Sequence, residues 1–290
     1  PPTSSQLVKL ENVLMSWKQK KVKIIITRHN HNRHAVNDQN DSIQYKNLFQ
    51  LVYKYCDGII HLGFSSIQLL HNDFEINDSV KHVVIPHGVY EYKNSLSKDE
   101  SRKILKISKN KKVILVFGKV RSVQEKKQII SSFNKLNIHE KYLLATRWYY
   151  SKNFFIRSLE KVINKYLRKN YHINDKLIDN DDVQLYFNSA DIVFIPRINS
   201  LNSGVLILGF SFGKVVIGSE YGNIGEILKN TGNPTFLPND VKSVSKAIKE
   251  GLKLNNQDKG KENYEYAYKN WNWELISNSH INYYKQVLHV

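Results

Sequence analysis

The chain of 290 residues is long enough for one large or two medium α/β domains, and 41% of it is hydrophobic. Its single cysteine, Cys56, excludes an intrachain disulfide framework, and no apolar run approaches the ~20 residues of a membrane span. The net charge of +17 fits either a lysine-rich solvated surface or contact with an anionic membrane. Nucleic acid is not expected as a partner, because no zinc spacing, RNA-binding signature or helix-turn-helix pattern is present.

The first ninety residues alternate amphipathic helical patterns with short apolar runs. We predict, in chain order, a helix at 7–20, a strand at 22–27, a helix at 43–56, a strand at 58–62, a helix from Ser65 and a strand at 82–86. Such alternation is typical of βαβ units and a parallel sheet. Because the first element is a helix and the chain does not open with Met, we expect an earlier part of this domain to be missing.

A second α/β run follows residues 90–101, which are polar and are the best candidate for a linker. We predict strands at 112–117, 142–146, 191–196 and 214–218, and helices at 123–136, 151–168, from Ser203, at 240–254, at 258–270 and from Trp271 to the end. The fold class is therefore α/β, with two doubly wound parallel-sheet domains.

The most informative stretch is 200–213, a polar turn followed by an apolar helix and a glycine. Asn202, Ser203 and Gly204 fall at the helix start, where backbone N–H groups lack intrahelical partners and the dipole end is positive. Such a start binds phosphate well. The alternative is an ordinary serine N-cap on a core helix.

Ligands of open α/β sheets bind beyond the carboxyl ends of strands. Gly118, Lys119, Arg121 and Lys126 follow one predicted strand, and this set of glycine and cations suits a diphosphate. The sequence has neither a Walker lysine motif nor a Gly-x-Gly-x-x-Gly fingerprint, which disfavours an NTPase or a dinucleotide enzyme. It also lacks a carboxylate pair placed for hydrolysis. Asp191, at the start of a strand, is expected to be structural.

Five segments together resemble the ordered signature of GT-B glycosyltransferases, most closely the group 1 family that acts on bacterial polysaccharides and glycolipids. These are Thr27-Arg-His-Asn…His34, Val84-Ile-Pro-His-Gly-Val-Tyr90, Val116-Phe-Gly-Lys-Val-Arg-x4-Lys126, Ser189-Ala-Asp-Ile-Val-Phe-Ile-Pro-Arg197 and Ser203-Gly…Gly218. The resemblance runs from about residue 7 to the end. No single motif is specific, but their order is.

The resemblance implies an incomplete, acceptor-side Rossmann-like domain at 1–92, a donor-binding domain at 93–270 and a final helix at 271–290 that returns to the first domain. It implies transfer of a hexose from a UDP or GDP sugar to a glycan or lipid-linked glycan, without a metal or other cofactor, in bacterial surface polysaccharide synthesis. We expect a cytoplasmic location, with the inner face of the plasma membrane as a site of peripheral association.

Particular residues take their roles from the resemblance. Catalytic contacts are expected from His29, Arg121 and Lys126, and donor-binding contacts from Gly88, Gly118, Arg121, Lys126, Asn202, Ser203 and Gly204. Gly88 is also expected to permit a tight hinge turn next to the donor. Solvated surface charge remains the alternative for Arg121 and Lys126, and a solvated loop histidine for His29. His31 and His34 lie beside His29, but without cysteine or acidic partners they make a poor zinc site.

One departure from the family pattern affects the expected chemistry. Many relatives carry Glu-x7-Glu here, with the second glutamate contacting the nucleotide ribose or the sugar. The corresponding positions hold Ser200 and Leu208, so the ribose must be bound in another way and retention of configuration is not assured. The alternative function is therefore a non-catalytic module of the same fold that binds a nucleotide sugar or glycan.

Overall fold

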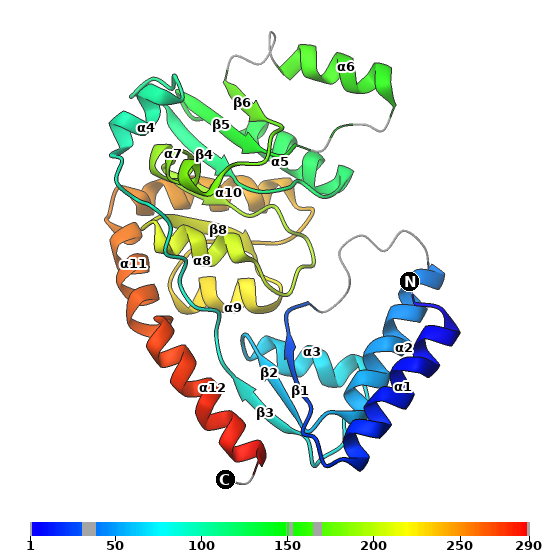
Figure 1. Cartoon of the computed structure of the whole chain (residues 1–290). Helices are drawn as coiled ribbons and strands as arrows, with labels where there is room; N and C mark the ends of the chain where they lie inside the picture. The colour runs from blue at the N-terminus through cyan, green and yellow to red at the C-terminus, as the bar shows by residue number, and fades with distance from the viewer. Residues whose placement is uncertain (1, 31–38, 149, 151–152, 165–169, 289–290) are drawn as a thin grey trace. The chain divides into compact units, whose positions relative to one another are not determined.

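The computed structural model describes residues 2–30, 39–148, 150, 153–164 and 170–288. The chain divides into two compact units (Figure 1). The first unit contains Pro1–Gly88, Ser200–Asn202 and Trp271–Val290, and the second contains Val89–Asn199 and Ser203–Asn270. The described helices include none that is both long and apolar enough to cross a lipid bilayer.

The first unit has a parallel sheet in the order β1-β2-β3. Its elements are α1 (Ser4–Gln19), β1 (Ile25–Arg28), α2 (Gln39–Tyr55), β2 (Gly58–His61), α3 (Ser65–Asp73), β3 (Lys81–Val84) and α12 (Trp273–Leu288). All seven coincide with predicted elements, and the parallel pairing follows from the helical crossovers between the strands.

Neighbouring residues of β2 supply the two faces of this sheet. Ile59 packs with Tyr53 of α2 and Leu70 of α3, whereas Ile60 packs with Ile276 and Tyr283 of α12. Because successive strand side chains point to opposite faces, α2 and α3 cover one face and the last helix covers the other. The sequence far downstream is thus part of the core of the first unit.

The second unit contains a six-stranded sheet in the order β6-β5-β4-β7-β8-β9, and every strand pair is parallel. The strands are β4 (Lys112–Val116), β5 (Lys141–Thr146), β6 (Tyr171–Asn174), β7 (Ile192–Phe194), β8 (Val215–Ser219) and β9 (Thr235–Phe236). The helices are α4 (Lys98–Ile104), α5 (Val123–Lys135), α6 (Phe154–Val162), α7 (Val183–Ser189), α8 (Gly204–Ser211), α9 (Gly222–Asn230), α10 (Val241–Asn255) and α11 (Lys259–Asn270), with a 3₁₀ turn at Asn180–Asp182. The two parallel sheets confirm the α/β fold class.

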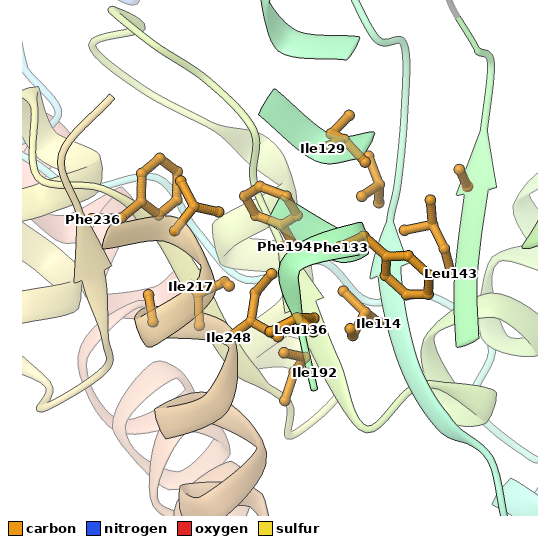
Figure 2. Close-up of a cluster of buried hydrophobic side chains, with 14 of the residues drawn as sticks. Ile114, Ile129, Phe133, Leu136, Leu143, Ile192, Phe194, Ile217, Phe236 and Ile248 are labelled. Atoms are coloured by element: carbon orange, nitrogen blue, oxygen red, sulfur yellow. The ribbon is translucent and has the colours of Figure 1, made fainter. Parts of the chain in front are cut away.

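Figure 2 shows the apolar layer between the sheet of the second unit and helices α5 and α10. Phe133 comes from α5 and Ile248 from α10, and both pack against strand residues that include Ile114 and Ile217. On the opposite face Phe187 of α7 stacks with Phe212 at 5.0 Å between ring centroids. Helices on both faces explain why β4 and β8 are buried along almost their whole length.

Helix α4 lies partly inside the stretch 90–101 that the sequence suggested as a linker. Its N-cap is Ser97, whose side chain accepts a hydrogen bond from Glu100 N, while the Glu100 side chain returns to the Ser97 backbone. This reciprocal pair is a capping box, which satisfies two N–H groups at the helix start. A Ser-x-x-Glu pattern in the sequence was the overlooked signal.

The amino-terminal edge of the second sheet is held by Asp191. Its carboxylate accepts hydrogen bonds from Lys98 Nζ at 2.6 Å, Arg102 Nη2 at 2.9 Å and Val113 N at 2.6 Å. Although burial opposes ionisation, these partners hold the pKa of Asp191 below its usual value. Asp191 is thus a structural residue, and the surface hollow that it lines with Lys112, Lys249 and Lys253 lies away from the strand carboxyl ends.

Candidate donor site

Strand order in the second unit reverses between β4 and β7, since β5 and β6 extend to one side and β8 and β9 to the other. In open α/β sheets the loops after two such strands separate and leave a crevice for a ligand. The loop after β4 contains Gly118 and Arg121, and the loop after β7 contains Arg197. The candidate site is built where these loops meet.

Gly118 opens the loop after β4 in a conformation that favours glycine. Its φ angle is +83°, and its N–H donates to Thr146 Oγ1 at 2.8 Å, at the end of β5. A Cβ atom at Gly118 would lie 3.9 Å from Val205 Cγ2, in the first turn of α8. The loop after β4 therefore runs beside the start of α8, and left-handed backbone is the reason for glycine here.

A buried ion pair fixes the base of the loop. Arg197 Nη1 lies 2.6 Å from Glu125 Oε2, and both side chains are 7% exposed. Arg197 also donates through Nη2 to Lys119 O at 2.9 Å, and Arg121 N donates to Glu125 Oε2 at 2.7 Å. These contacts tie together the ends of β4 and β7 and the first turn of α5, so the loop backbone is held before any ligand binds.

Arg121 presents an exposed side chain from this fixed backbone. Partial burial of the guanidinium and the nearby charge of Arg197 lower its pKa to about 10, with Glu125 acting in the opposite direction. The side chain is therefore still cationic at neutral pH. A planar cation beside a second arginine suits a ligand with more than one negative oxygen.

Lys126, the second predicted phosphate cation, lies in the first turns of α5. Its ammonium group forms an ion pair with Glu160 of α6 and is largely covered by protein. The neighbouring Lys127 is exposed. In this structure the charge of Lys126 is thus already compensated by a carboxylate.

Helix α8 begins at Gly204, with Ser203 as the N-cap residue. The Ser203 side chain makes no capping hydrogen bond, so the first N–H groups of the helix are not satisfied by the serine. A Cβ atom at Gly204 would lie 2.8 Å from Tyr90 Oη, and Tyr90 N donates to Ser211 Oγ at 3.1 Å. Tyr90 therefore borders the start of α8 closely enough to favour glycine there.

The positions that carry glutamates in many relatives differ in environment. Leu208 is buried in the middle of α8, where it contributes to the core, whereas Ser200 is half-buried before the helix. An apolar side chain at 208 suits that buried position, and a carboxylate there would need a partner to offset its desolvation.

The remaining site candidates, His29, Gly88 and Asn202, belong to the first unit. His29 directly follows β1 and is exposed, and partial burial together with the charge of His87 lowers its pKa. The imidazole is therefore neutral at neutral pH. Asn202 lies in the short Ser200–Asn202 segment of that unit.

Gly88 was expected to permit a tight hinge turn, but the structure gives another reason for glycine. Its φ angle is not among the positive values of the described glycines, and a Cβ atom would lie 2.7–2.9 Å from three ring carbons of Trp273. The His87 ring also packs edge-on against Trp273, at 6.3 Å between centroids. Close approach of the α12 indole, rather than an unusual turn, favours glycine at this position.

His31 and His34, the residues weighed as zinc ligands, lie outside the described residues. Among the residues that are described, no group of three His, Cys, Asp or Glu side chains is placed to hold a metal ion.

Sequence patterns missed part of the machinery of the site. Glu125 follows Ser122 by three residues, the spacing of a capping box, and Ser122 Oγ does accept from Glu125 N at 3.1 Å. Its carboxylate, however, turns to Arg197 and to Arg121 N. Thr146, Glu160 and Tyr90 contact Gly118, Lys126 and the start of α8, but they lie too far away along the chain for any local pattern to indicate these contacts.

Among the comparisons with known proteins, only the comparison with solved structures identifies the fold. No family model matches the sequence, and no curated protein matches it. Solved structures do: sucrose-phosphate synthase from Thermosynechococcus elongatus superposes with a TM-score of 0.72 at 17% identity, covering 94% of this chain and 71% of that one. A glycosyltransferase from Rickettsia africae gives 0.68 at 18% identity, covering 99% and 82%.

The HepE protein of Anabaena, solved in complex with UDP, gives a TM-score of 0.76 at 11% identity and covers 97% of this chain and 77% of its own. The same protein has also been solved with UDP-glucose. Similarity at this level of identity establishes the architecture: the chain has the fold of GT-B glycosyltransferases.

Proposed function

We propose that this GT-B chain is a glycosyltransferase that moves a hexose from a UDP or GDP sugar to a glycan or lipid-linked glycan. One observation carries the proposal. Gly118, which opens the fixed loop after β4, lies beside the first turn of α8, and the same loop carries Arg121, at the strand-order reversal of the second unit. Structural relatives that bind UDP and UDP-glucose support the choice of donor.

The reaction breaks the bond between the anomeric carbon and the diphosphate oxygen. The leaving diphosphate keeps the electron pair, the acceptor hydroxyl oxygen bonds to the anomeric carbon, and its proton passes to a base or to water. Arg121 and the first N–H groups of α8 are proposed to bind the diphosphate, where their positive charge offsets the charge that grows on the leaving group. These groups supply that stabilisation without a metal.

His29, with its lowered pKa, is proposed to contact the transferred sugar as a neutral imidazole. Gly88, Gly118 and Asn202 are proposed to border the donor, and Lys126 to assist the phosphate contact once it separates from Glu160. We further propose a cytoplasmic protein that acts in surface polysaccharide synthesis and meets its acceptor at an anionic membrane surface.

Thermal-shift titration with UDP, GDP and their sugars tests the donor site. A ligand at 100 times its Kd stabilises the folded state by about 2.7 kcal/mol, which raises Tm by several degrees in a domain of this size. One nucleotide should give this shift and the corresponding nucleoside monophosphate much less, because the diphosphate contact is lost. If none of the nucleotides raises Tm, the donor-site proposal is wrong.

A non-catalytic binding module is the second candidate, and the residues at the glutamate positions favour it. With Ser200 and buried Leu208, neither family carboxylate is present to contact the ribose or the sugar. The two functions differ in turnover. Release of free nucleoside diphosphate from the bound donor in the presence of acceptor supports the transferase, whereas saturable donor binding with neither hydrolysis nor transfer supports the module.

A further inference from the structure

Helix α6 carries its apolar side chains outward. Figure 1 shows it beyond β6, at the periphery of the second unit. None of its residues is buried, and its exposed side chains include Phe154 at 65%, Phe155 at 81% and Leu159 at 60%. Adjacent exposed phenylalanines on one short helix are unusual for a solvated surface, because each leaves a large apolar area in water.

The helix is amphipathic, and its polar side is the one attached to the protein. Phe155, Leu159 and Val162 are spaced at i, i+4 and i+7 and therefore share one face. Glu160, which lies off that face, pairs with Lys126 of α5, and Lys161 pairs with Asp175 at 3.1 Å. These ion pairs anchor the polar side, so the apolar stripe faces away from the sheet.

Basic residues accompany the stripe. Arg157 lies on the helix with its guanidinium 5.9 Å from the Phe154 ring centroid, and Lys161 follows one turn later. Along the sequence, residues 147–170 contain seven lysines and arginines and a single acidic residue, Glu160. An amphipathic helix with aromatic side chains on one face and Lys or Arg nearby is suited to lie in the interface of an anionic bilayer.

We propose that α6 is a membrane-docking helix that inserts Phe154, Phe155 and Leu159 among the headgroups of an anionic lipid surface. Charge favours this occupant over a second copy of the chain, since a copy would bring the same basic helix and the same net charge of +17 to the contact. This role for α6 rests on the proposed function. A docked α6 would place the donor unit itself at the lipid surface where a lipid-linked acceptor resides.

Vesicle cosedimentation of the whole chain tests the inference. The probes are vesicles of pure phosphatidylcholine and vesicles in which about a third of the lipid is phosphatidylglycerol, each at low and high salt. We expect binding to the anionic vesicles that weakens as salt rises, and little binding to the neutral ones. Absence of binding to anionic vesicles at low salt overturns the proposal.

Variants locate the contact. The double variant Phe154→Ser/Phe155→Ser should lower the partition coefficient about tenfold or more, because two aromatic side chains no longer leave water on binding. Phe64→Ser is the matched control, since Phe64 is 70% exposed but lies at the start of α3 in the first unit. Equal binding by the double variant and wild type overturns the assignment to α6, even if the membrane is bound elsewhere.

Two further measurements distinguish lipid docking from self-association and from the donor site. Concentration-dependent dimerisation that the double variant abolishes, without vesicle binding by wild type, would show that α6 docks a second copy and would overturn the lipid assignment. The double variant should retain the wild-type thermal shift with nucleotide, because these phenylalanines lie outside the donor site. Loss of vesicle binding with nucleotide binding intact therefore tests docking separately from the proposed function.

Discussion

Glu125 and Arg197 lie 72 residues apart in the chain, yet their side chains form an ion pair of 2.6 Å that is almost closed to solvent. The same carboxylate oxygen accepts the Arg121 N–H, and the same guanidinium donates to Lys119 O. The pair therefore joins the loops after β4 and β7. Its position at the strand-order reversal makes it a positioning element for the proposed phosphate contact of Arg121.

Glu125→Gln should reduce both stability and nucleotide binding. The substitution keeps the shape of the side chain but leaves the Arg197 guanidinium buried without a counter-charge, which costs about 3–5 kcal/mol. Urea unfolding should show the loss, and nucleotide affinity should fall because the Arg121 backbone is no longer held. Gln124→Ala, on the exposed neighbour, is the control. A Glu125→Gln protein with wild-type stability would mean that the pair does not hold the loop.

Arg121→Ala should weaken nucleoside diphosphate binding by ten- to a hundredfold. One charge-assisted contact of this kind contributes roughly 1.5–3 kcal/mol, and an exposed side chain contributes little to the fold. Isothermal titration with the nucleotide identified by thermal shift gives the affinity, and urea unfolding gives the stability. The free energy of unfolding should change by less than the free energy of nucleotide binding does. If the Arg121→Ala protein binds the nucleotide with unchanged affinity, Arg121 does not contact the diphosphate.

Lys126→Ala and Lys127→Ala form a matched pair for the second cation. The ion pair with Glu160 compensates the charge of Lys126 in the free protein, so its removal should weaken nucleotide binding less than Arg121→Ala. Lys127→Ala should leave affinity unchanged, because its side chain is solvated. Titration of all three variants gives the ranking. Equal effects at 126 and 127 would place the phosphate site elsewhere.

Hydrophobic patterning was sufficient to predict the strongly buried elements of this fold. The strands at 112–116 and 215–219 are apolar along their length because helices cover both faces of the sheet, and the sequence shows this as continuous apolar runs. The short β6 and β9 were missed. Both lie at the sheet edges, where Tyr171–Asn174 alternates polar and apolar side chains and Thr235–Phe236 is too short to show a period.

Local features of the candidate site could be predicted where the backbone dictates the residue, and not where tertiary contacts do. Gly118 has a left-handed backbone and Gly204 starts a helix, so the local sequence around each glycine indicates its place in the fold. No local pattern indicates the pairing of Glu125 with Arg197, because that pairing depends on strand order. Gly88 was recognised for a different reason from the one observed, since the indole that approaches it comes from residue 273.

Gly88→Ala should destabilise the first unit by about 1–3 kcal/mol, the usual cost of an added methyl group in a packed contact. The new Cβ would lie 2.7–2.9 Å from the Trp273 ring, so the indole or the α12 backbone must move. Trp273→Ala removes that obstacle. Urea unfolding of both single variants and the double variant should show that the two effects are not additive. Strict additivity would mean that the ring does not restrict residue 88.

The lowered pKa of the buried His61 should make the stability of the folded protein depend on pH. Its ring contacts Ser66 Oγ at 2.8 Å through Nδ1 and His82 Nδ1 at 3.0 Å through Nε2. Burial, followed by the charges of His82, Arg28 and His71, lowers its pKa from the ordinary value of 6.5 to about 3. Between these two pKa values the unfolded chain binds a proton that the folded chain does not, so stability falls as pH decreases.

At pH 5 this one group should cost about 2 kcal/mol of unfolding free energy relative to neutral pH, since each pH unit between the two pKa values costs about 1.4 kcal/mol. His61→Gln should flatten the pH dependence by that amount, whatever its effect at pH 7. His139→Gln, at a highly exposed position, is the control. Tryptophan fluorescence is a suitable probe, because Trp17, Trp271 and Trp273 belong to the first unit. The same slope in His61→Gln and wild type would show that His61 titrates normally in the folded protein.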